Sequence, residues 1–192
     1  HDLHFLKHPE DTSKEIRRDY GPLAARAITD ADAVIVPSKA TAAELEELVG
    51  STPRRVAIIP HGIDAIFTAE PEGPNESEDV KRRLSIPAEF FLFVGCPEPR
   101  KNLLNTISAY VLLRQENPGI QLHLVIAGKA GWGANSIFSM AKDYRDHIFF
   151  TGFVDDDDLA YLYSGALAMS YVFFYEGFGV PPLEAMCCGT PG

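Results

Sequence analysis

Two adjacent cations, Arg100 and Lys101, stand where a short apolar run gives way to a stretch with helical spacing. The apolar run, residues 90–94, ends at Gly95, and the helical stretch begins after Asn102. Cations at the N-terminus of a helix act together with backbone N–H groups and the helix dipole on a bound anion. The pattern by itself leaves two interpretations open, a phosphate site and a solvated turn with surface cations.

A second junction of the same kind spans residues 176–184, with the sequence EGFGVPPLE. Gly177 and Gly179 allow the backbone to approach a ligand closely, and two consecutive prolines suit the first turn of a helix. Glu184 is expected in that first turn. The alternative is that Glu184 only complements the helix dipole and that Glu176 is a surface residue at a strand end.

These residues resemble a known family. The spacing of Glu176 and Glu184 in EGFGVPPLEAMCCGTP is similar to the paired-glutamate motif of glycosyltransferase family 4, a group of retaining GT-B-type enzymes. The EPRKN sequence at 98–102 resembles the phosphate loop of the mannosyltransferase-like members. Supporting matches lie at His1-Asp2, at 60–64 (PHGID) and at 150–154 (FTGFV), so the resemblance covers essentially the whole chain in the expected order.

The resemblance implies a role for each matched residue. Arg100 and Lys101 would neutralise the diphosphate of the donor as it leaves, Glu176 would bind hydroxyls of the transferred sugar, and Glu184 would bind the ribose. His1 matches a histidine that projects into the interdomain cleft near the sugar. The residues expected to act in catalysis are Arg100, Lys101, Glu176 and His1. The residues expected to bind the donor are Gly95, Gly177, Phe178, Gly179, Val180 and Glu184. Many family members have Arg where this chain has Cys96, which leaves Arg100 as the second cation.

The activity that the resemblance implies is retaining transfer of a hexosyl group from a nucleoside diphosphate sugar, with GDP-mannose favoured, to a saccharide or lipid-linked acceptor. The alternative is a fragment or non-catalytic subunit that binds the nucleotide sugar without turnover. Glu176 or Glu184 as a glycosidase-type nucleophile is a chemical alternative, disfavoured for the second because ribose would occupy it. A phosphorylase relative would need a lysine for pyridoxal phosphate, and no sequence context nominates one. No cofactor is therefore expected.

The elements that must hold these residues alternate along the chain, as in parallel α/β sheets. Strands are predicted at 33–36, 55–59, 90–94, 121–127, 147–153 and 166–174, and helices at 41–49, 103–115, 136–144 and 157–164. We expect two Rossmann-like units of GT-B type, both incomplete. Residues 1–67 would end the acceptor-side domain, the acidic segment 68–79 would be a linker, and residues 80–192 would begin the donor-binding domain. The chain does not begin with Met and ends directly after an expected helix, so we expect a longer parent protein.

Composition narrows the choice of partners. The net charge of −10, from 17 basic and 27 acidic residues, disfavours nucleic acid. No apolar run is long enough to span a membrane and no signal peptide is recognisable, so a cytoplasmic location is expected. Three cysteines, two of them adjacent, do not suggest disulfides or zinc. A homo-oligomer that covers exposed sheet edges would be a natural arrangement.

Two further patterns invite a ligand and are interpreted otherwise. The run of aspartates at 155–158 is expected to cap a helix rather than to bind a divalent metal, so no metal site is predicted. The glycine-rich segment 128–133 lacks the spacing of a nucleotide loop, and a surface loop is favoured over a turn near the nucleotide in which Lys129 touches the donor.

Overall fold

The computed structural model describes residues 1–49, 55–70, 76–129 and 134–192 of the chain. These residues form two compact units. The first unit contains His1–Gly62 together with Tyr175–Gly179, and the second contains Ile63–Phe174 and Val180–Gly192. Of the helices in the described ranges, none combines the length and the apolar character needed to cross a bilayer.

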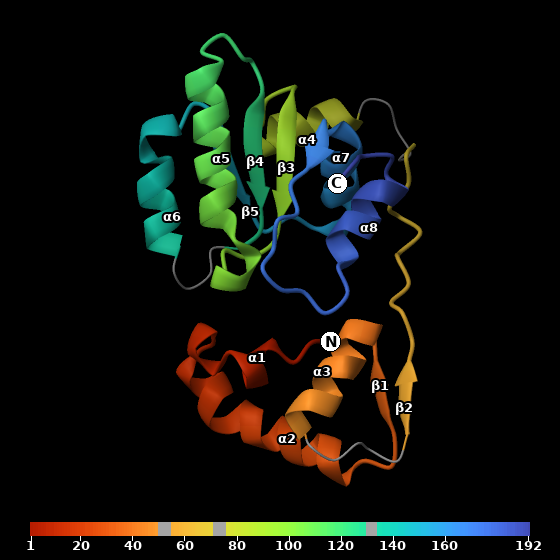
Figure 1. The fold of residues 1–192 in the computed structure, drawn as a ribbon. Helices are drawn as coiled ribbons and strands as arrows, with labels where there is room; N and C mark the ends of the chain where they lie inside the picture. Colours follow the sequence, from red (N-terminus) through yellow and green to blue (C-terminus); the bar gives the residue numbers. More distant parts are fainter. Residues whose placement is uncertain (50–54, 71–75, 130–133) are drawn as a thin grey trace. The chain divides into compact units, whose positions relative to one another are not determined.

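The first unit is mostly helical and holds a two-stranded parallel sheet (Figure 1). Its elements are α1 (His4–Lys7), η1 (Pro9–Asp11), η2 (Ile16–Tyr20), α2 (Gly21–Asp30), β1 (Val34–Val36), α3 (Lys39–Val49) and β2 (Val56–Ile58). Val34 pairs with Val56, and the register continues to the ends of both strands. The two strands and the helix between them were predicted from the sequence and are confirmed.

Helix α3 begins two residues before its predicted start because Ser38 caps it. The Ser38 hydroxyl accepts a hydrogen bond from the backbone N–H of Thr41 at 3.1 Å. This is the usual way in which a serine satisfies an unpaired donor in the first turn of a helix.

The second unit is a four-stranded parallel sheet in the order β5-β4-β3-β6, with helices on both faces. Its strands are β3 (Phe90–Val94), β4 (His123–Ala127), β5 (Ile148–Gly152) and β6 (Ala168–Met169). Its helices are α4 (Glu76–Leu84), η3 (Pro99–Lys101), α5 (Leu103–Glu116), α6 (Ala134–Ala141), η4 (Lys142–Tyr144), α7 (Asp156–Gly165) and α8 (Val180–Cys187). The α/β architecture with parallel sheets was predicted from the sequence and is confirmed.

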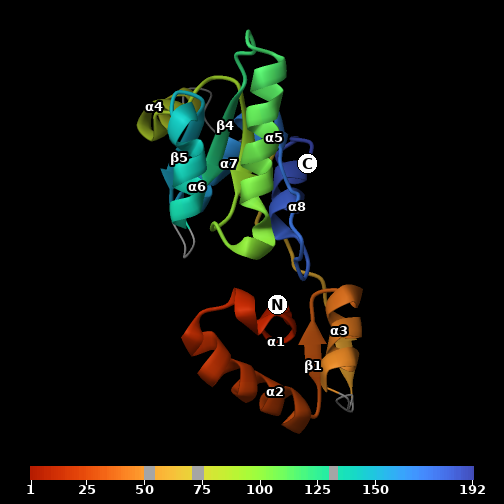
Figure 2. The ribbon, with the colours of Figure 1, turned by 60° about the vertical axis from the view of Figure 1, so that its left-hand side comes forward.

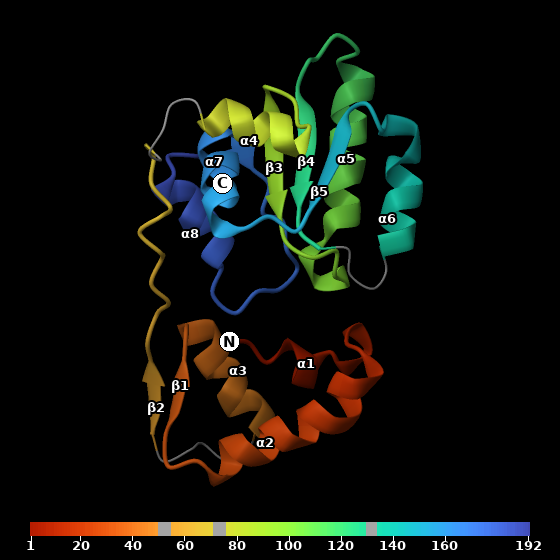
Figure 3. The same ribbon diagram turned by 180° about the vertical axis from the view of Figure 1, so that it is seen from behind.

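Alternation along the strands supplies a separate core on each face of this sheet. Phe90 and Leu92 point to the face covered by α7 and α8, whereas Phe93 points to the face covered by α5 and α6. Figure 2 shows α5 and α6 along one side of the strands, and Figure 3, from behind, shows α4 and α7 on the other side. Strands β3 and β6 are neighbours in the sheet, and the strand order reverses between them. In open parallel sheets, ligands bind beyond the carboxyl ends of the strands at such a switch point.

Two segments differ from the sequence-based expectation. The predicted linker 68–79 includes the first turn of α4, which begins at Glu76, and its residues 71–75 lie outside the described residues. The helix forms there because Val80 is buried while the basic residues of its last turn complement the helix dipole. Phe67, placed at the end of the first predicted domain, lies instead in the core of the second unit, with its ring 5.7 Å from that of Tyr163.

The prediction of a strand over 166–174 is wrong for most of that segment, because β6 spans only Ala168–Met169. The backbone pairs with β3 through Ser170, whose N–H donates to the carbonyl of Leu92 at 2.8 Å. Beyond that residue the hydrogen bonds go to the turn before α5 instead. Asn102 donates its side-chain amide to the carbonyl of Val172 at 2.9 Å, and Phe174 N–H donates to the carbonyl of Arg100 at 2.8 Å.

Candidate functional site

The carboxyl ends of β3 and β4 lie in direct contact through two glycines. Gly95 N–H donates to the carbonyl of Ala127 at 2.8 Å, and both Gly95 and Gly128 have positive φ angles, of 144° and 152°. A Cβ atom at Gly128 would lie 2.3 Å from the carbonyl oxygen of Gly95. Only glycine fits such an approach, so the two loops that leave these strands begin side by side.

Lys101 folds back over the end of β3. Its Nζ lies 2.8 Å from the position that a Cβ of Gly95 would occupy, and 5.2 Å from the ring centroid of Phe173. A side chain at position 95 would therefore displace the lysine. The contact with the ring face is a cation–π interaction, which holds the ammonium group at the strand end.

Arg100 belongs to the same short turn and is paired within it. Its Nε donates to Oε2 of Glu98 at 2.8 Å, and the two side chains form an ion pair. Asn102 follows in the left-handed conformation with φ of 56°, and α5 begins at the next residue. The turn therefore presents the charge of Lys101 beside an arginine whose charge Glu98 partly offsets.

Glu184 lies deeper in its helix than the sequence suggested. Because α8 begins at Val180, Glu184 is the fifth helical residue and lies outside the first turn, which contains no acidic residue. The hydroxyl of Tyr163 donates to Oε2 of Glu184 at 2.8 Å. Burial raises the pKa of Glu184, and the hydrogen bond from Tyr163 opposes this shift. Burial is the main cause that raises the pKa of Tyr163, and the negative charge of the nearby Glu184 raises it further. The phenol therefore keeps its proton and acts as a donor.

The other predicted site residues belong to the first unit, except Val180, which belongs to the second. Two of them, His1 and Phe178, contact His61. His1 Nδ1 and His61 Nε2 are 3.1 Å apart, and the ring of Phe178 meets His61 edge-on at 5.2 Å. A Cβ at Gly177 would lie 2.4 Å from the carbonyl oxygen of His1, so this glycine is required by the backbone of the N-terminal segment. Gly179 has φ of 87° and ends the loop before Val180 begins α8. The structure thus brings together His1, Gly177 and Phe178 in the first unit, and Gly95 with Lys101 in the second.

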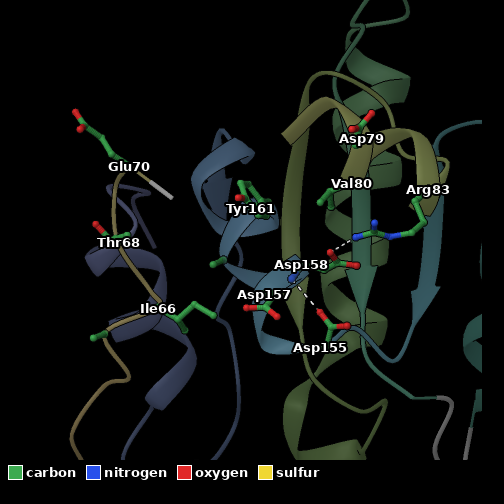
Figure 4. Close-up of a pocket in the computed structure, with 12 residues that line it drawn as sticks. Ile66, Thr68, Glu70, Asp79, Val80, Arg83, Asp155, Asp157, Asp158 and Tyr161 are labelled. Atoms are coloured by element: carbon green, nitrogen blue, oxygen red, sulfur yellow. Dashed lines mark hydrogen bonds and ion pairs between the residues drawn. The ribbon is translucent and has the colours of Figure 1, made fainter. Parts of the chain in front are cut away.

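A cavity of about 880 Å³ in the second unit has a different chemistry (Figure 4). Its described lining contains Arg83 and the carboxylates Glu70, Asp79, Asp155, Asp157 and Asp158. Arg83 is paired with Asp158, so negative charge prevails and would repel a diphosphate. Asp155 accepts a hydrogen bond from the N–H of Asp158 at 3.0 Å and is the N-cap of α7, which confirms the capping role predicted for this run.

Sequence reasoning missed three contacts around the candidate site. Tyr163 gave no signal, because its hydrogen bond to Glu184 joins two helices that are distant in the sequence. His61 was noted as part of a motif, without its contact to His1. Ser38 and Thr41 were assigned only to a turn and a helix, although two hydroxyls three residues apart lie on one helix face.

Solved structures with this arrangement define its class. The chain superposes with a TM-score of 0.74 on sucrose-phosphate synthase from Thermosynechococcus elongatus, at 26% identity, covering 100% of this chain and 47% of that one. It superposes equally, with a TM-score of 0.74 and 22% identity, on HepE of Anabaena in complex with UDP-glucose, covering 97% of this chain and 50% of that one. The fold is that of the GT-B glycosyltransferases, of which the chain holds part.

Sequence comparison gives the family. The model described as "Glycosyl transferases group 1" matches residues 76–192, and that of "Glycosyltransferase Family 4" matches residues 1–67. The chain belongs to the group 1 glycosyl transferases, and the family resemblance found in the sequence is confirmed.

Two relatives from Escherichia coli carry mannosyltransferase names. O-antigen chain mannosyltransferase B is 29% identical over 100% of this chain and 50% of its own length. The serotype-specific mannosyltransferase WbdA is 34% identical over 83% of this chain and 20% of its own length. The chain therefore spans half, or less, of the length of these relatives.

Proposed function

We propose that the chain forms the donor-binding part of a retaining hexosyltransferase that takes mannose from GDP-mannose and passes it to a saccharide or lipid-linked acceptor. The observation that carries the proposal is the position of Lys101, folded over Gly95 at the carboxyl end of β3 beside the switch point of the sheet. The mannosyltransferase names of both relatives support the choice of sugar. The cytoplasmic location expected from the sequence and the assignment of acceptor-side and donor-side domains stay predictions.

The proposed chemistry follows from the charge that develops as the donor breaks. Cleavage of the bond between sugar and nucleoside diphosphate places negative charge on the phosphate oxygens, and preorganised donors stabilise that charge in the transition state. We assign this role to Lys101 and Arg100, which supply positive charge without a metal. The donor-binding role expected for residues 177–179 stays a prediction. Loss of one such donor typically costs about 3 kcal/mol, or roughly a hundredfold in rate.

Glu184 and Glu176 are proposed to hold the two sugars of the donor. Glu184 accepts hydrogen bonds from the ribose hydroxyls with the carboxylate capacity that Tyr163 leaves unused. Glu176 accepts hydrogen bonds from hydroxyls of the transferred hexose. His1, whose carbonyl lies against Gly177, is proposed to lie near the same sugar. The anomeric configuration is proposed to be retained by attack on the face from which the leaving group departs.

Binding and turnover of a small donor panel test this function. The purified 192-residue chain and the native gene product are heated with GDP, UDP and ADP, and a bound nucleotide raises the melting temperature in proportion to its affinity. GDP-mannose, UDP-glucose and ADP-glucose are then assayed for hydrolysis and transfer, and the anomeric configuration of the product is read by NMR. Lys101→Gln is expected to lose roughly a hundredfold in rate, whereas Lys142→Gln, on an exposed helical turn, is expected to leave the rate unchanged.

A second candidate function is nucleotide-sugar binding without turnover. The observation in its favour is that the chain spans 50% of the length of one mannosyltransferase relative and 20% of another. If the 192-residue chain binds GDP while neither it nor the native gene product turns over any donor, the binding function replaces the enzyme.

A further inference from the structure

The loop that carries Glu176 is held on both sides of that residue by one face of α3. On one side the hydroxyl of Tyr175 donates to Oε2 of Glu44. On the other side the carbonyl of Gly177 accepts two hydroxyl hydrogen bonds, from Ser38 Oγ at 2.6 Å and from Thr41 Oγ1 at 3.2 Å. All of these residues belong to the first unit, although 130 or more positions separate the loop from α3 in the sequence.

The spacing of the three side chains on the helix suits this task. Ser38 caps α3, and Thr41 and Glu44 follow at intervals of three residues, which places them on one face of the helix. Ser38 accepts the N–H of Thr41 and still has its own hydrogen to donate to Gly177. A carbonyl oxygen has two lone pairs, so Gly177 accommodates both hydroxyls.

Burial makes the contact costly to lose. Thr41 is 2% exposed, and a buried hydroxyl without a partner costs more than the hydrogen bond itself contributes. The Glu44 side chain is 13% exposed and also pairs with Lys7, with Nζ 3.6 Å from Oε1. Burial and the hydrogen bond to Glu44 raise the pKa of Tyr175, so its hydroxyl remains a donor at physiological pH.

Packing restricts the loop further. The ring of Tyr175 stacks on His4, with centroids 5.1 Å apart and planes 27° apart. Gly177 lies so close to the carbonyl of His1 that a Cβ there would be 2.4 Å from its oxygen. The backbone is therefore fixed immediately before and immediately after Glu176.

We propose that Ser38, Thr41 and Glu44 are positioning residues, whose contacts with Tyr175 and Gly177 fix the backbone of Glu176 and so aim its carboxylate at the hexose of the donor. The part that concerns the hexose rests on the proposed function. The part that concerns the loop stands on the contacts alone, and the two parts have separate readouts.

Thr41→Val is the sharpest variant, because it keeps the shape of the side chain and removes the hydroxyl that reaches Gly177. Tyr175→Phe tests the contact on the other side of Glu176. Thr29→Val is the matched control, since Thr29 lies exposed on α2 and its hydroxyl donates within its own helix, to the carbonyl of Ala25 at 2.9 Å. Ser38→Ala is less informative because it also removes the cap of α3.

The first readout is hydrogen exchange of the native gene product without ligand. Thr41→Val and Tyr175→Phe are expected to speed exchange in peptides that cover 175–179, whereas Thr29→Val is expected to match the wild type there. Unchanged exchange in both test variants would overturn the proposal, whatever the protein binds.

The second readout is calorimetric affinity for GDP and for GDP-mannose. The Kd for GDP divided by the Kd for GDP-mannose isolates the contribution of the hexose. Each test variant is expected to lower this quotient about fivefold, because GDP-mannose binds more weakly, while the affinity for GDP stays within about twofold of the wild type. An equal loss of affinity for both ligands would assign α3 a general structural role and overturn the positioning role. If the wild type binds neither ligand, the proposed function fails, and the exchange measurement still decides whether α3 holds the loop.

Discussion

Replacing Tyr163 with Phe tests whether the hydrogen bond to Glu184 governs the charge of that carboxylate. Tyr163 is fully buried, and the substitution keeps its ring while removing the hydroxyl that lies 2.8 Å from Oε2 of Glu184. A hydrogen bond to a charged group is worth about 1.5–3 kcal/mol. Because Glu184 is only half-buried, solvent screening places the expected cost near the lower end, at about 1.5 kcal/mol.

The cost is expected to depend on pH in a definite direction. Burial raises the pKa of Glu184 in the folded protein, so the stability that this group contributes is complete below its unfolded value and is lost as the pH rises through the folded value. Tyr163 lowers that pKa, so Tyr163→Phe raises it further and widens the range over which stability is lost. The difference between wild type and variant is therefore expected to be small at pH 4.5 and largest at pH 7.5.

Urea denaturation followed by circular dichroism measures the effect, in the wild-type background and in Glu184→Gln. At pH 7.5 we expect Tyr163→Phe to lower the free energy of unfolding by about 1.5 kcal/mol in the wild-type background. The loss is expected to be clearly smaller in Glu184→Gln, because a neutral amide gains less from the hydroxyl than a carboxylate does. An equal cost in both backgrounds at both pH values would show that the hydroxyl acts independently of the charge of Glu184 and would refute the reasoning.

Three further predictions follow from local geometry. Gly128→Ala is expected to destabilise the protein by about 3 kcal/mol, measured as a lower urea midpoint, since φ is 152° and the new Cβ would meet the carbonyl of Gly95 at 2.3 Å. Asp155→Ala is expected to cost about 1 kcal/mol, measured by thermal unfolding, because the cap on Asp158 N–H is lost. GDP affinity is expected to fall as the pH is lowered through the raised pKa of Glu184, because a protonated carboxyl accepts ribose hydroxyls less well, and calorimetry should show that Glu184→Gln loses this part of the pH dependence.

Matched controls separate these effects from general damage. Gly119→Ala is the control for Gly128→Ala, because a Cβ at Gly119 meets nothing within 4 Å, and an equal loss of stability in both would contradict the steric argument. Asp157→Ala removes a charge from the first turn of α7 without removing the cap, so it should cost less than Asp155→Ala. An unchanged pH dependence of GDP affinity in Glu184→Gln would exclude Glu184 as its source.

Much of the fold was readable in the sequence because local patterns carried it. The apolar run at 90–94 and the alternation at 121–127 predicted β3 and β4, whose inward residues fill separate cores on the two faces. The aspartates at 155–158 predicted the cap of α7 because capping depends only on neighbouring residues. The strand predicted over 166–174 was wrong because only local sequence was considered. Its apolar residues suit a strand, but the backbone of its second half forms hydrogen bonds with the turn at 100–102.

The paired glutamates and the cations before α5 could be picked out from the sequence alone, because residue type and spacing within a short segment are local properties. The roles proposed for them stay predictions. Tertiary structure decided what touches them. It brought Tyr163 to Glu184, Lys101 back over Gly95, and the hydroxyls of Ser38 and Thr41 to the carbonyl of Gly177. The contacts of Tyr163, Ser38 and Thr41 join residues that are distant along the chain, and they depend on how helices and loops pack. Lys101 and Gly95 are close in the sequence, but their contact depends on how the turn between them folds, which residue types alone do not specify.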